Sequence, residues 1–364
     1  MAYFLGSSNY FQWKKQTAFG TKASMASATV AASPLPESVH FRARQYRQNR
    51  LDNITLLPRA GDTFNVPKIV DWGASFLFYQ NVTLIDFLCS AFGTEIRTGA
   101  AAPFTHKWYI AQPFMDGGTD PGSGAGTYYG RALTLQHVVN NIGIGWEIEN
   151  AVVNSLSIVF EQAQMGKLIV GGVGANKANQ GSPTAFSYPT SAPFNWAHLA
   201  TAAGPPTSGI WVTSAAAPNT PVQATNDLLV TKLTFNLDNN LLIQPALGIA
   251  ATQQFMKPER DGYPTMEVVL EGLADTQTAS LFSTKLAIDS FINAELVNII
   301  AKASAATNSI LEFQFTKNAE GMIIFDDPEL SYSGDGLMRW QVKGSIYPIT
   351  AVADAYVQLT STVS

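Results

Sequence analysis

Two glycine-bounded segments of this chain share one length and one layout. They occupy residues 166–174 and 336–344, and each begins and ends with glycine. An alternating apolar–polar segment precedes each of them, at 154–160 and 321–332. Glycine at both ends suits a strand that is entered through a tight turn and left at a bulge or a close backbone approach. Because the layout recurs in both halves of the chain, it predicts that one β-domain is present twice.

The composition is compatible with two domains whose surface is poor in charge. A length of 364 residues predicts about two domains, and a hydrophobic content of 46% lets each half form a core. Charged residues make up 13% of the chain, about half of the ~25% that is typical. A neutral polar surface protects poorly against association. This favours a protein that is covered by copies of itself over a domain of merely modest solubility.

Charge and cysteine content limit the class of protein and the compartment in which it is made. The net charge of −5 and the pI of about 5.4 argue against a basic surface that grips nucleic acid, although DNA could still pass along the protein. The single cysteine, Cys89, excludes an internal disulfide and fits a reducing cytoplasm. Residues 1–16 lack the pattern of a signal peptide, and no apolar run is long enough to span a membrane. The expectation is a soluble protein that is made in the cytoplasm.

Composition shifts divide the chain into four parts. We predict an N-terminal arm at 1–37, a first β-domain at 38–174, a connecting segment at 175–226 and a second β-domain at 227–364. The connecting segment is rich in Pro, Ser, Thr, Ala and Gly but also carries aromatic residues, which a free linker does not need. We therefore expect it to dock on a surface of the protein.

The N-terminal arm is predicted to pack on a neighbouring copy. Four of its aromatic residues lie within 6–21, in a sequence too irregular to form its own core: Tyr10, Phe11, Trp13 and Phe19. The alternative is a partly disordered terminus. Four aromatic side chains favour the packed arm.

Alternating patterns predict a mainly β fold in each half. The predicted strands are 38–49, 69–79, 104–110, 131–139, 146–160 and 166–174 in the first half, and 228–237, 266–273, 308–315, 321–330 and 336–347 in the second. The glycine-rich segment 115–130 is interpreted as the tip of an extended hairpin between two of these strands. Strands around a single helix predict a β-sandwich with one flanking helix in each half.

The clearest helix of the chain is expected at 84–92. Thr83 and Asp86 have the spacing of a capping box, and Gly93 supplies the stop. The apolar residues that follow helical spacing are Leu84, Phe87, Leu88, Ala91 and Phe92. In the second half the same slot is occupied by 276–291, and the periodicity leaves the end of that helix open between 286 and 308.

Motifs of catalysis or metal binding are not found in the sequence. The four histidines, which are His40, His106, His137 and His198, share no ligand spacing. The glycine-rich segment 122–126 lacks the lysine and the helix of a phosphate loop, and 326–329 is an acidic turn rather than a calcium loop. The N-glycosylation motifs at 53–55 and 81–83 do not indicate glycosylation, because the chain shows no secretion signal. We predict no catalytic, cofactor-binding or metal-binding residue, and therefore no enzyme.

The densest basic cluster of the chain belongs to none of these motifs. It consists of Arg42, Arg44, Arg47 and Arg50, which lie on or beside the first predicted strand. A solvated strand face is the favoured interpretation, and ion pairing between subunits is the second.

Five segments together resemble the major tail tube proteins of long-tailed, siphovirus-type bacteriophages. They are 6–21, 84–93, 154–159, 193–196 and 233–241, and they follow one another in the order typical of that family. The similarity extends over nearly the whole chain, and the long segments 175–226 and 274–308 depart from it. The resemblance implies tandem β-sandwich or barrel domains, each with a flanking helix and an extended hairpin loop. It also implies a structural protein whose stacked rings form the conduit for genome DNA.

The resemblance also implies partners and a location. Six such domains make one ring, so a chain with two domains would form trimeric rings with pseudo-sixfold symmetry. The expected partners are the chain itself and the tail tip, tape-measure and tail terminator proteins. DNA would pass the mildly acidic lumen without specific binding, no membrane would be involved, and the location would be the virion tail. Two alternatives stay open: a β-sandwich module that binds or degrades surface glycans or binds a receptor, and a capsid decoration protein.

Overall fold

A computed structural model shows a mainly β protein built from antiparallel strands. The structure describes residues 9–25, 30–36, 38–49, 63–80, 84–110, 125–139, 144–180, 192–200, 209–214, 230–244, 257–274, 297–306, 308–317, 320–321, 323–326, 329–332, 334, 336–346 and 355–361. The described helices are α1 (Ile85–Phe92) and α2 (Trp196–Ala200). The predicted mainly β class is thus confirmed.

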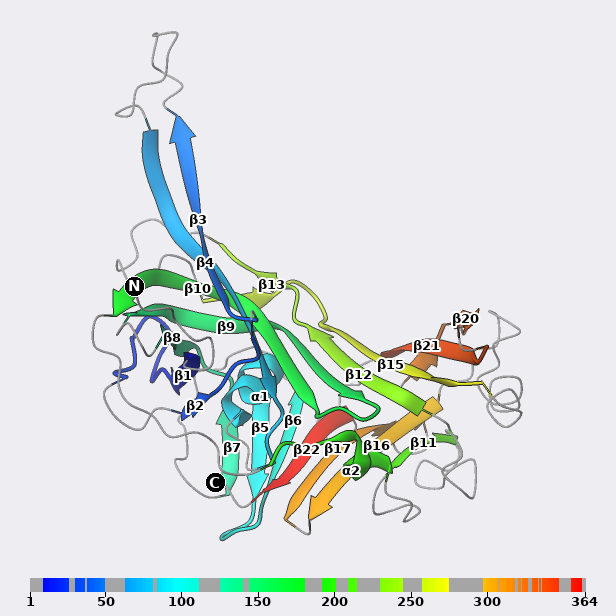
Figure 1. Cartoon of the computed structure of the whole chain (residues 1–364). Helices are drawn as coiled ribbons and strands as arrows, with labels where there is room; N and C mark the ends of the chain where they lie inside the picture. Colours follow the sequence, from blue (N-terminus) through cyan, green and yellow to red (C-terminus); the bar gives the residue numbers. More distant parts are fainter. Residues whose placement is uncertain are drawn as a thin grey trace, which may run out of the picture.

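The first layer is one long sheet that crosses from the first half of the chain into the second (Figure 1). Its strands are, in spatial order, β3 (His40–Asn49), β4 (Thr63–Leu77), β10 (Lys167–Gln180), β9 (Ile144–Glu161), β12 (Val230–Asp238), β15 (Thr265–Leu273) and β21 (Met338–Ile346). Beyond β21 lie the short strands β19 (Ile323–Phe325) and β20 (Glu329–Tyr332). We call this layer the long sheet.

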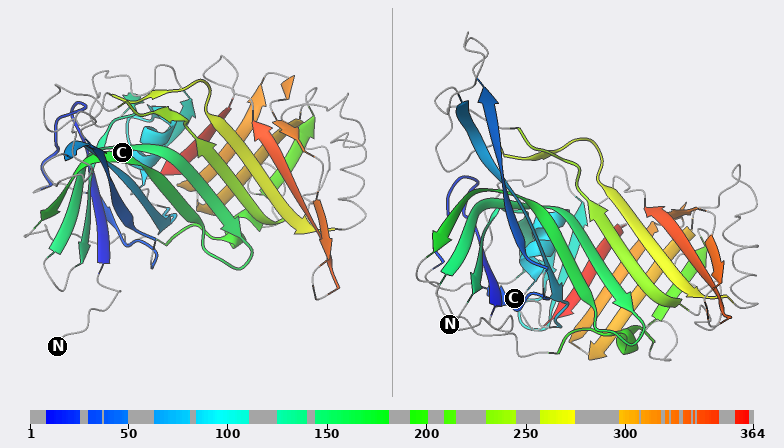
Figure 2. Two further views of the ribbon diagram at one scale, coloured as in Figure 1. Left: turned by 90° about the horizontal axis from the view of Figure 1, so that it is seen from above. Right: turned by 45° about the horizontal axis from the view of Figure 1, so that its top comes forward.

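The second layer faces the long sheet and also contains strands from both halves (Figure 2). Its order is β7 (Gly126–Tyr129), β5 (Gly93–Thr98), β6 (Phe104–Ile110), β22 (Ala355–Ser361), β17 (Ser309–Lys317), β16 (Val297–Ala306) and β11 (Gly209–Ser214). Phe235 of β12 packs against Phe313 of β17 with ring centroids 5.7 Å apart, which joins the layers through one core. The remaining strands are β8 (Leu133–Val139), β1 (Asn9–Lys15), β2 (Val30–Ala32), β13 (Leu241–Leu242), β14 (Glu259–Arg260) and β18 (Glu320–Gly321).

Strand pairing in the second half repeats the pairing in the first. The series β3–β4–β10–β9 has its counterpart in β12–β15–β21 followed by β20 and β19. The registers agree as well, since Gly174 lies opposite Val70 and Gly344 lies opposite Val268. The hairpin β5–β6 is likewise matched by β16–β17. The glycine repeat in the sequence therefore corresponds to a repeat in strand order over the described residues.

The glycines at the ends of 166–174 and 336–344 are required for two different reasons, a positive φ or a close approach of neighbouring atoms. Gly336 has a φ of 79°, which glycine adopts without strain. A Cβ on Gly344 would lie 2.6 Å from Cγ2 of Ile323, so this glycine permits a close approach. Gly166 is also a close approach, because its Cβ would lie 2.9 Å from the Phe160 ring. The expected turn at the start holds for 336–344 but not for 166–174, which begins at a close approach. The expected bulge or close approach at the end holds for both, because the register of β10 against β9 shifts at Gly174.

The two halves are joined by strand pairing as well as by the connecting segment. Strand β12 pairs with β9 over seven residues, and β22 pairs with both β6 and β17. The connecting segment 175–226 also contributes strands, because β10 runs on to Gln180 and β11 pairs with β16. A single hydrophobic cluster contains residues of both halves.

Helix α1 buries the predicted face but lies inside the protein. Leu84, Phe87, Leu88 and Phe92 are buried, as predicted, and Gly93 ends the helix in the left-handed conformation with a φ of 93°. The predicted capping box is wrong, because Leu84 occupies the N-cap position and no side chain caps the helix. The expectation of a flank position also fails for α1: seven of its eight residues are buried, and it lies between the two layers (Figure 2). The corresponding slot 276–291 lies outside the described residues.

The N-terminal arm requires a correction. Residues 9–15 form β1, which pairs with β8 and with β2 inside the first half. Tyr10, Phe11 and Trp13 are buried in the core of their own chain, and the Trp13 ring lies 4.7 Å from that of Phe87. Phe19 is half-buried against two smaller apolar clusters. The prediction that these aromatics pack on a neighbour is therefore wrong for residues 9–15.

The extended hairpin also lies elsewhere than predicted. Strand β6 pairs with β5 and β22, whereas β8 pairs with β1 and β9, so 104–110 and 131–139 do not form a hairpin. Residues 126–129 of the predicted tip are the strand β7, and 111–124 lie outside the described residues. The hairpin that extends from the body is β3–β4 (Figure 1).

Candidate assembly surfaces

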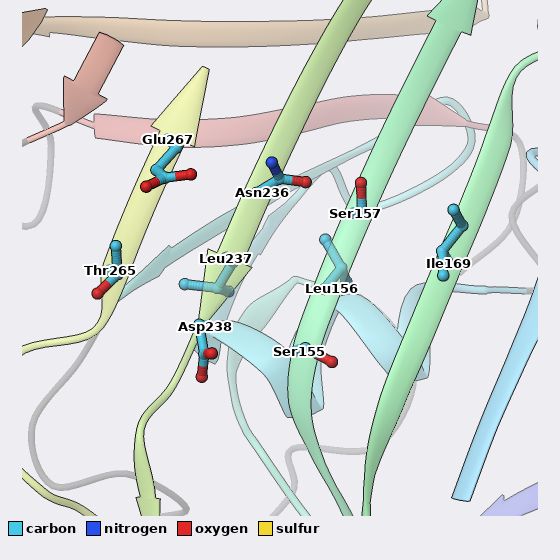
Figure 3. Close-up of a pocket in the computed structure, with 9 residues that line it drawn as sticks. All are labelled: Ser155, Leu156, Ser157, Ile169, Asn236, Leu237, Asp238, Thr265 and Glu267. Carbon is cyan, nitrogen blue, oxygen red and sulfur yellow. The ribbon is translucent and has the colours of Figure 1, made fainter. Parts of the chain in front are cut away.

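The outer face of the long sheet is polar and continuous across both halves. Alternate residues of each strand point away from the core, and Figure 3 shows nine residues around a shallow hollow of about 360 Å³ on this face. They come from β10, β9, β12 and β15: Ser155, Leu156, Ser157, Ile169, Asn236, Leu237, Asp238, Thr265 and Glu267. Four of the nine are exposed, namely Ser155, Ile169, Asp238 and Thr265, so hydroxyl, apolar and acidic side chains all reach the surface here.

Two lysines of the long sheet lie beside carboxylates. Lys232 pairs with Glu271 at 2.8 Å, and Lys343 pairs with Glu267 at 2.6 Å. The hydrogen bond from Lys343 to Glu267 raises the pKa of the lysine. Such exposed pairs contribute at most about 1 kcal/mol to stability, but they balance the charge of these two lysines. Arg42 of β3 and Arg339 of β21, which belong to the same sheet, are exposed.

The long sheet ends in two strands that have one partner strand each among the described residues. At one end β3 pairs with β4, and at the other β20 pairs with β21. All four residues of β20 are exposed, including Leu330 and Tyr332. Arg42 of β3 is exposed too, and the side chains of the rest of the arginine cluster lie outside the described residues. Exposed strand edges with apolar residues are pairing sites for another chain.

A clamp of two side chains holds the end of α1 to the second half. The Nδ2 of Asn239, a fully buried residue, donates to the carbonyl oxygens of Ala91 at 2.8 Å and Val153 at 3.1 Å. Arg260 donates to the carbonyl oxygen of Phe92 at 2.9 Å and to Oδ1 of Asn239 at 2.9 Å. The last carbonyls of a helix need such donors, and a cation is favourable there. Burial lowers the pKa of Arg260 to about 10.

Arg260→Met should destabilise the protein by about 1.5–3 kcal/mol, the range for hydrogen bonds to a charged donor. Methionine keeps much of the apolar stem but leaves the helix carbonyls without that donor. Urea unfolding at pH 7 measures the change. Lys257→Met, at an exposed position nearby, is the control and should leave stability nearly unchanged. A loss below 0.5 kcal/mol, as at an ordinary surface site, would contradict the clamp.

A buried polar network that sequence reasoning missed lies on the inner side of the second layer. Glu95 accepts from Nδ1 of His106 at 2.8 Å, from Nε1 of Trp108 at 3.2 Å and from Nε of Arg97 at 3.3 Å. Arg97 also donates to the hydroxyl of Tyr128 at 3.1 Å and stacks on its ring. All five residues are buried. In the sequence, the network is visible only as charged residues that alternate with other residues in 93–98 and 104–110. Alternation of this kind is typical of a strand with one solvent-exposed face, so it did not indicate a buried network.

The carboxylate at the centre of this network has its hydrogen-bonding capacity filled by the side chains around it. Burial by itself would raise the pKa of Glu95, but the hydrogen bond and charge of His106, with the charges of Arg97 and Lys15, lower it below its ordinary value. The carboxylate thus remains ionised, with donors on both oxygens. We interpret the network as a structural one.

The predicted candidate residues are not brought together. His40 lies on β3, His106 in the buried network, His137 against Trp146, and His198 beside Asn195. Burial lowers the pKa of both His137 and His198. Within the described ranges, no group of three His, Cys, Asp or Glu residues could hold a metal ion. Asp326 and Glu329 of the acidic turn are exposed, while the sequons and 122–124 lie outside the described residues.

Among the helices that the structure describes, none has the length and apolar character needed to cross a membrane. No protein-family model matches the chain, and no curated protein matches it either.

Proposed function

We propose that this chain is the building block of a phage tail tube, in which three copies close a ring and rings stack around a channel for DNA. The observation that carries the proposal is the long sheet. It runs without a break through two halves with repeated strand order, and among the described residues its outermost strands β3 and β20 have one partner strand each. A chain with two equivalent units and two different free edges can close into a ring by head-to-tail contacts.

The rigid junction between the halves supports this role. Two halves that act as successive units of a ring must keep a fixed relative orientation. Here the β9–β12 ladder, the β6–β22–β17 ladder and the clamp on α1 all cross the junction. Three separate connections favour a stiff double unit over two domains on a linker.

The outer face of the long sheet suits the wall of a DNA channel. Lys232 and Lys343 are paired with carboxylates, and the residues that line the hollow include no lysine or arginine. Paired cations add little to the electrostatic attraction that dominates non-specific DNA binding. We propose that DNA passes this face without sequence-specific contacts. The tail tip, tape-measure and tail terminator proteins, and a place in the virion tail, belong to the same proposal.

A module that degrades glycans is less well supported by the same surface. The hollow contains the carboxylates of Asp238 and Glu267, but Glu267 is ion-paired with Lys343 and Asp238 accepts hydrogen bonds from Asn154 and Asn240. Both carboxylates thus already have partners within the same chain.

Negative-stain microscopy of the concentrated purified protein tests the proposal. The expected images show rings with a central channel, and stacks of rings at higher concentration. Mass measurement of isolated rings should give three chains. Compact trimers that never stack would favour a decoration protein, and a protein that stays monomeric at all concentrations would overturn the tube proposal.

A further inference from the structure

Strand β20 exposes residues that its counterpart in the first half buries. Leu330 and Tyr332 are 60% and 77% exposed. Leu330 lies opposite Trp340 of β21, just as Leu156 of β9 lies opposite Val170 of β10. With 336–344 aligned on 166–174, these two residues therefore correspond to Leu156 and Ile158.

The difference between the two sites is the strand that follows. Leu156 and Ile158 are buried, and β12 pairs with β9 directly beside them. No described strand of the chain takes that place beside β20. An apolar edge strand without a partner or a protecting charge on its inner face is an association site. The missing neighbour of β20 is thus a strand equivalent to β12.

The same chain has such a strand at the other end of the long sheet. Strand β3 is the counterpart of β12, because β3 pairs with β4 as β12 pairs with β15. Neighbouring strands of the sheet are antiparallel throughout, so β3 of a second copy beside β20 would continue the alternation. We propose that β20 of one copy pairs with β3 of the next, and that the β9–β12 ladder inside the chain is the template for this contact.

The template also fixes the register and fits the charges. Ser157 lies opposite Asn236 in the β9–β12 ladder, and the corresponding positions between copies are Ser331 and Arg44. Strand β20 carries the exposed acidic residue Glu329, and the exposed Asp326 follows β19 at the same end of the sheet, whereas β3 carries the arginine cluster, of which Arg42 is exposed. Arg339 of β21 lies opposite Ser331 and is an exposed cation beside these acidic residues. Opposite charges at the two edges favour a head-to-tail contact over the pairing of like edges. This assigns the arginine cluster to contacts between subunits.

This inference rests on the proposed ring and goes further by naming the two strands and their register. The test is chemical cross-linking of Ser331→Cys/Arg44→Cys with a short bis-maleimide. Cys89 is buried and is present in every variant, so the cross-linking of the wild type measures the background. The positive control is Ser157→Cys/Asn236→Cys, which should cross-link within one chain. The expected product of the test variant is covalent dimers and trimers, which neither single-cysteine variant should give beyond background.

A surface substitution gives a second reading that does not depend on cysteine chemistry. Tyr332→Lys should raise the protein concentration needed for assembly at least tenfold and leave the unfolding transition unchanged, because Tyr332 is exposed in the single chain. Tyr263→Lys is the matched control, since Tyr263 is 80% exposed at a different site. It should assemble as the wild type does.

The outcomes separate the inference from the tube proposal. One outcome would overturn the edge pairing alone: the wild type forms rings, the Ser331–Arg44 cross-link is absent, and Tyr332→Lys assembles normally. Cross-linked open chains without rings would support the edge pairing and overturn the tube. Absence of both cross-links and assemblies would overturn both.

Discussion

Replacing Phe87 with alanine should lower the free energy of unfolding by about 3–5 kcal/mol, the range for a buried aromatic residue. Phe87 is fully buried in the middle of α1. Its ring centroid lies 4.7 Å from that of Trp13, 5.8 Å from that of Phe76 and 6.0 Å from that of Trp72. These rings belong to β1 and β4, so they cannot all move into the space that the substitution opens.

Urea unfolding of Phe87→Ala at pH 7 measures this loss. Phe87→Leu keeps most of the volume and should lose distinctly less stability. Tyr263→Ala removes an aromatic side chain from an exposed position and should lie within about 0.5 kcal/mol of the wild type. Equal stability of Phe87→Ala and the wild type would mean that α1 does not anchor the core.

Local sequence patterns predicted the elements that depend on local periodicity. The alternation at 69–79 corresponds to β4, and the helical spacing at 84–92 corresponds to α1 with Gly93 as its stop. Glycine spacing identified the strands β10 and β21, because close approaches and turns restrict the residue type. These features depend on neighbours along the chain, which the sequence displays directly.

Pairings between distant segments could not be read from those patterns. Nothing in 9–15 distinguishes a strand that fills its own core from an arm that reaches a neighbour, because both need aromatic residues. The β9–β12 and β6–β22 ladders connect residues that are far apart in sequence. An alternating pattern predicts a strand but does not identify the strand with which it pairs. The same limit hid the polar network, since Glu95 and Arg97 look like residues of a solvated face until β6 and β7 lie beside them.

Glu95→Gln should destabilise the protein by about 3–5 kcal/mol at pH 7, because it leaves the buried cation of Arg97 without its counter-charge. Glutamine keeps the shape of the side chain, so cavity formation contributes little. The double variant Glu95→Gln/Arg97→Met removes both charges and should lose less stability than the sum of the two single variants. Additive losses in this double-mutant cycle would show that the two charges are not coupled.

The effect of Glu95→Gln should also depend on pH in one direction. The folded protein holds the pKa of Glu95 below its ordinary value, through His106 above all and through Arg97 and Lys15, against the opposing effect of burial. A carboxylate with a lowered pKa binds fewer protons in the folded state than in the unfolded state. Its contribution is complete above the ordinary glutamate pKa of about 4.3 and is lost as the pH falls below it. The difference in unfolding free energy between the wild type and Glu95→Gln should therefore shrink as the pH falls from about 5 toward 3.5. A difference that grows over this pH range would mean that Glu95 is protonated in the folded protein, and the network would then have to be redrawn with a neutral carboxyl group at its centre.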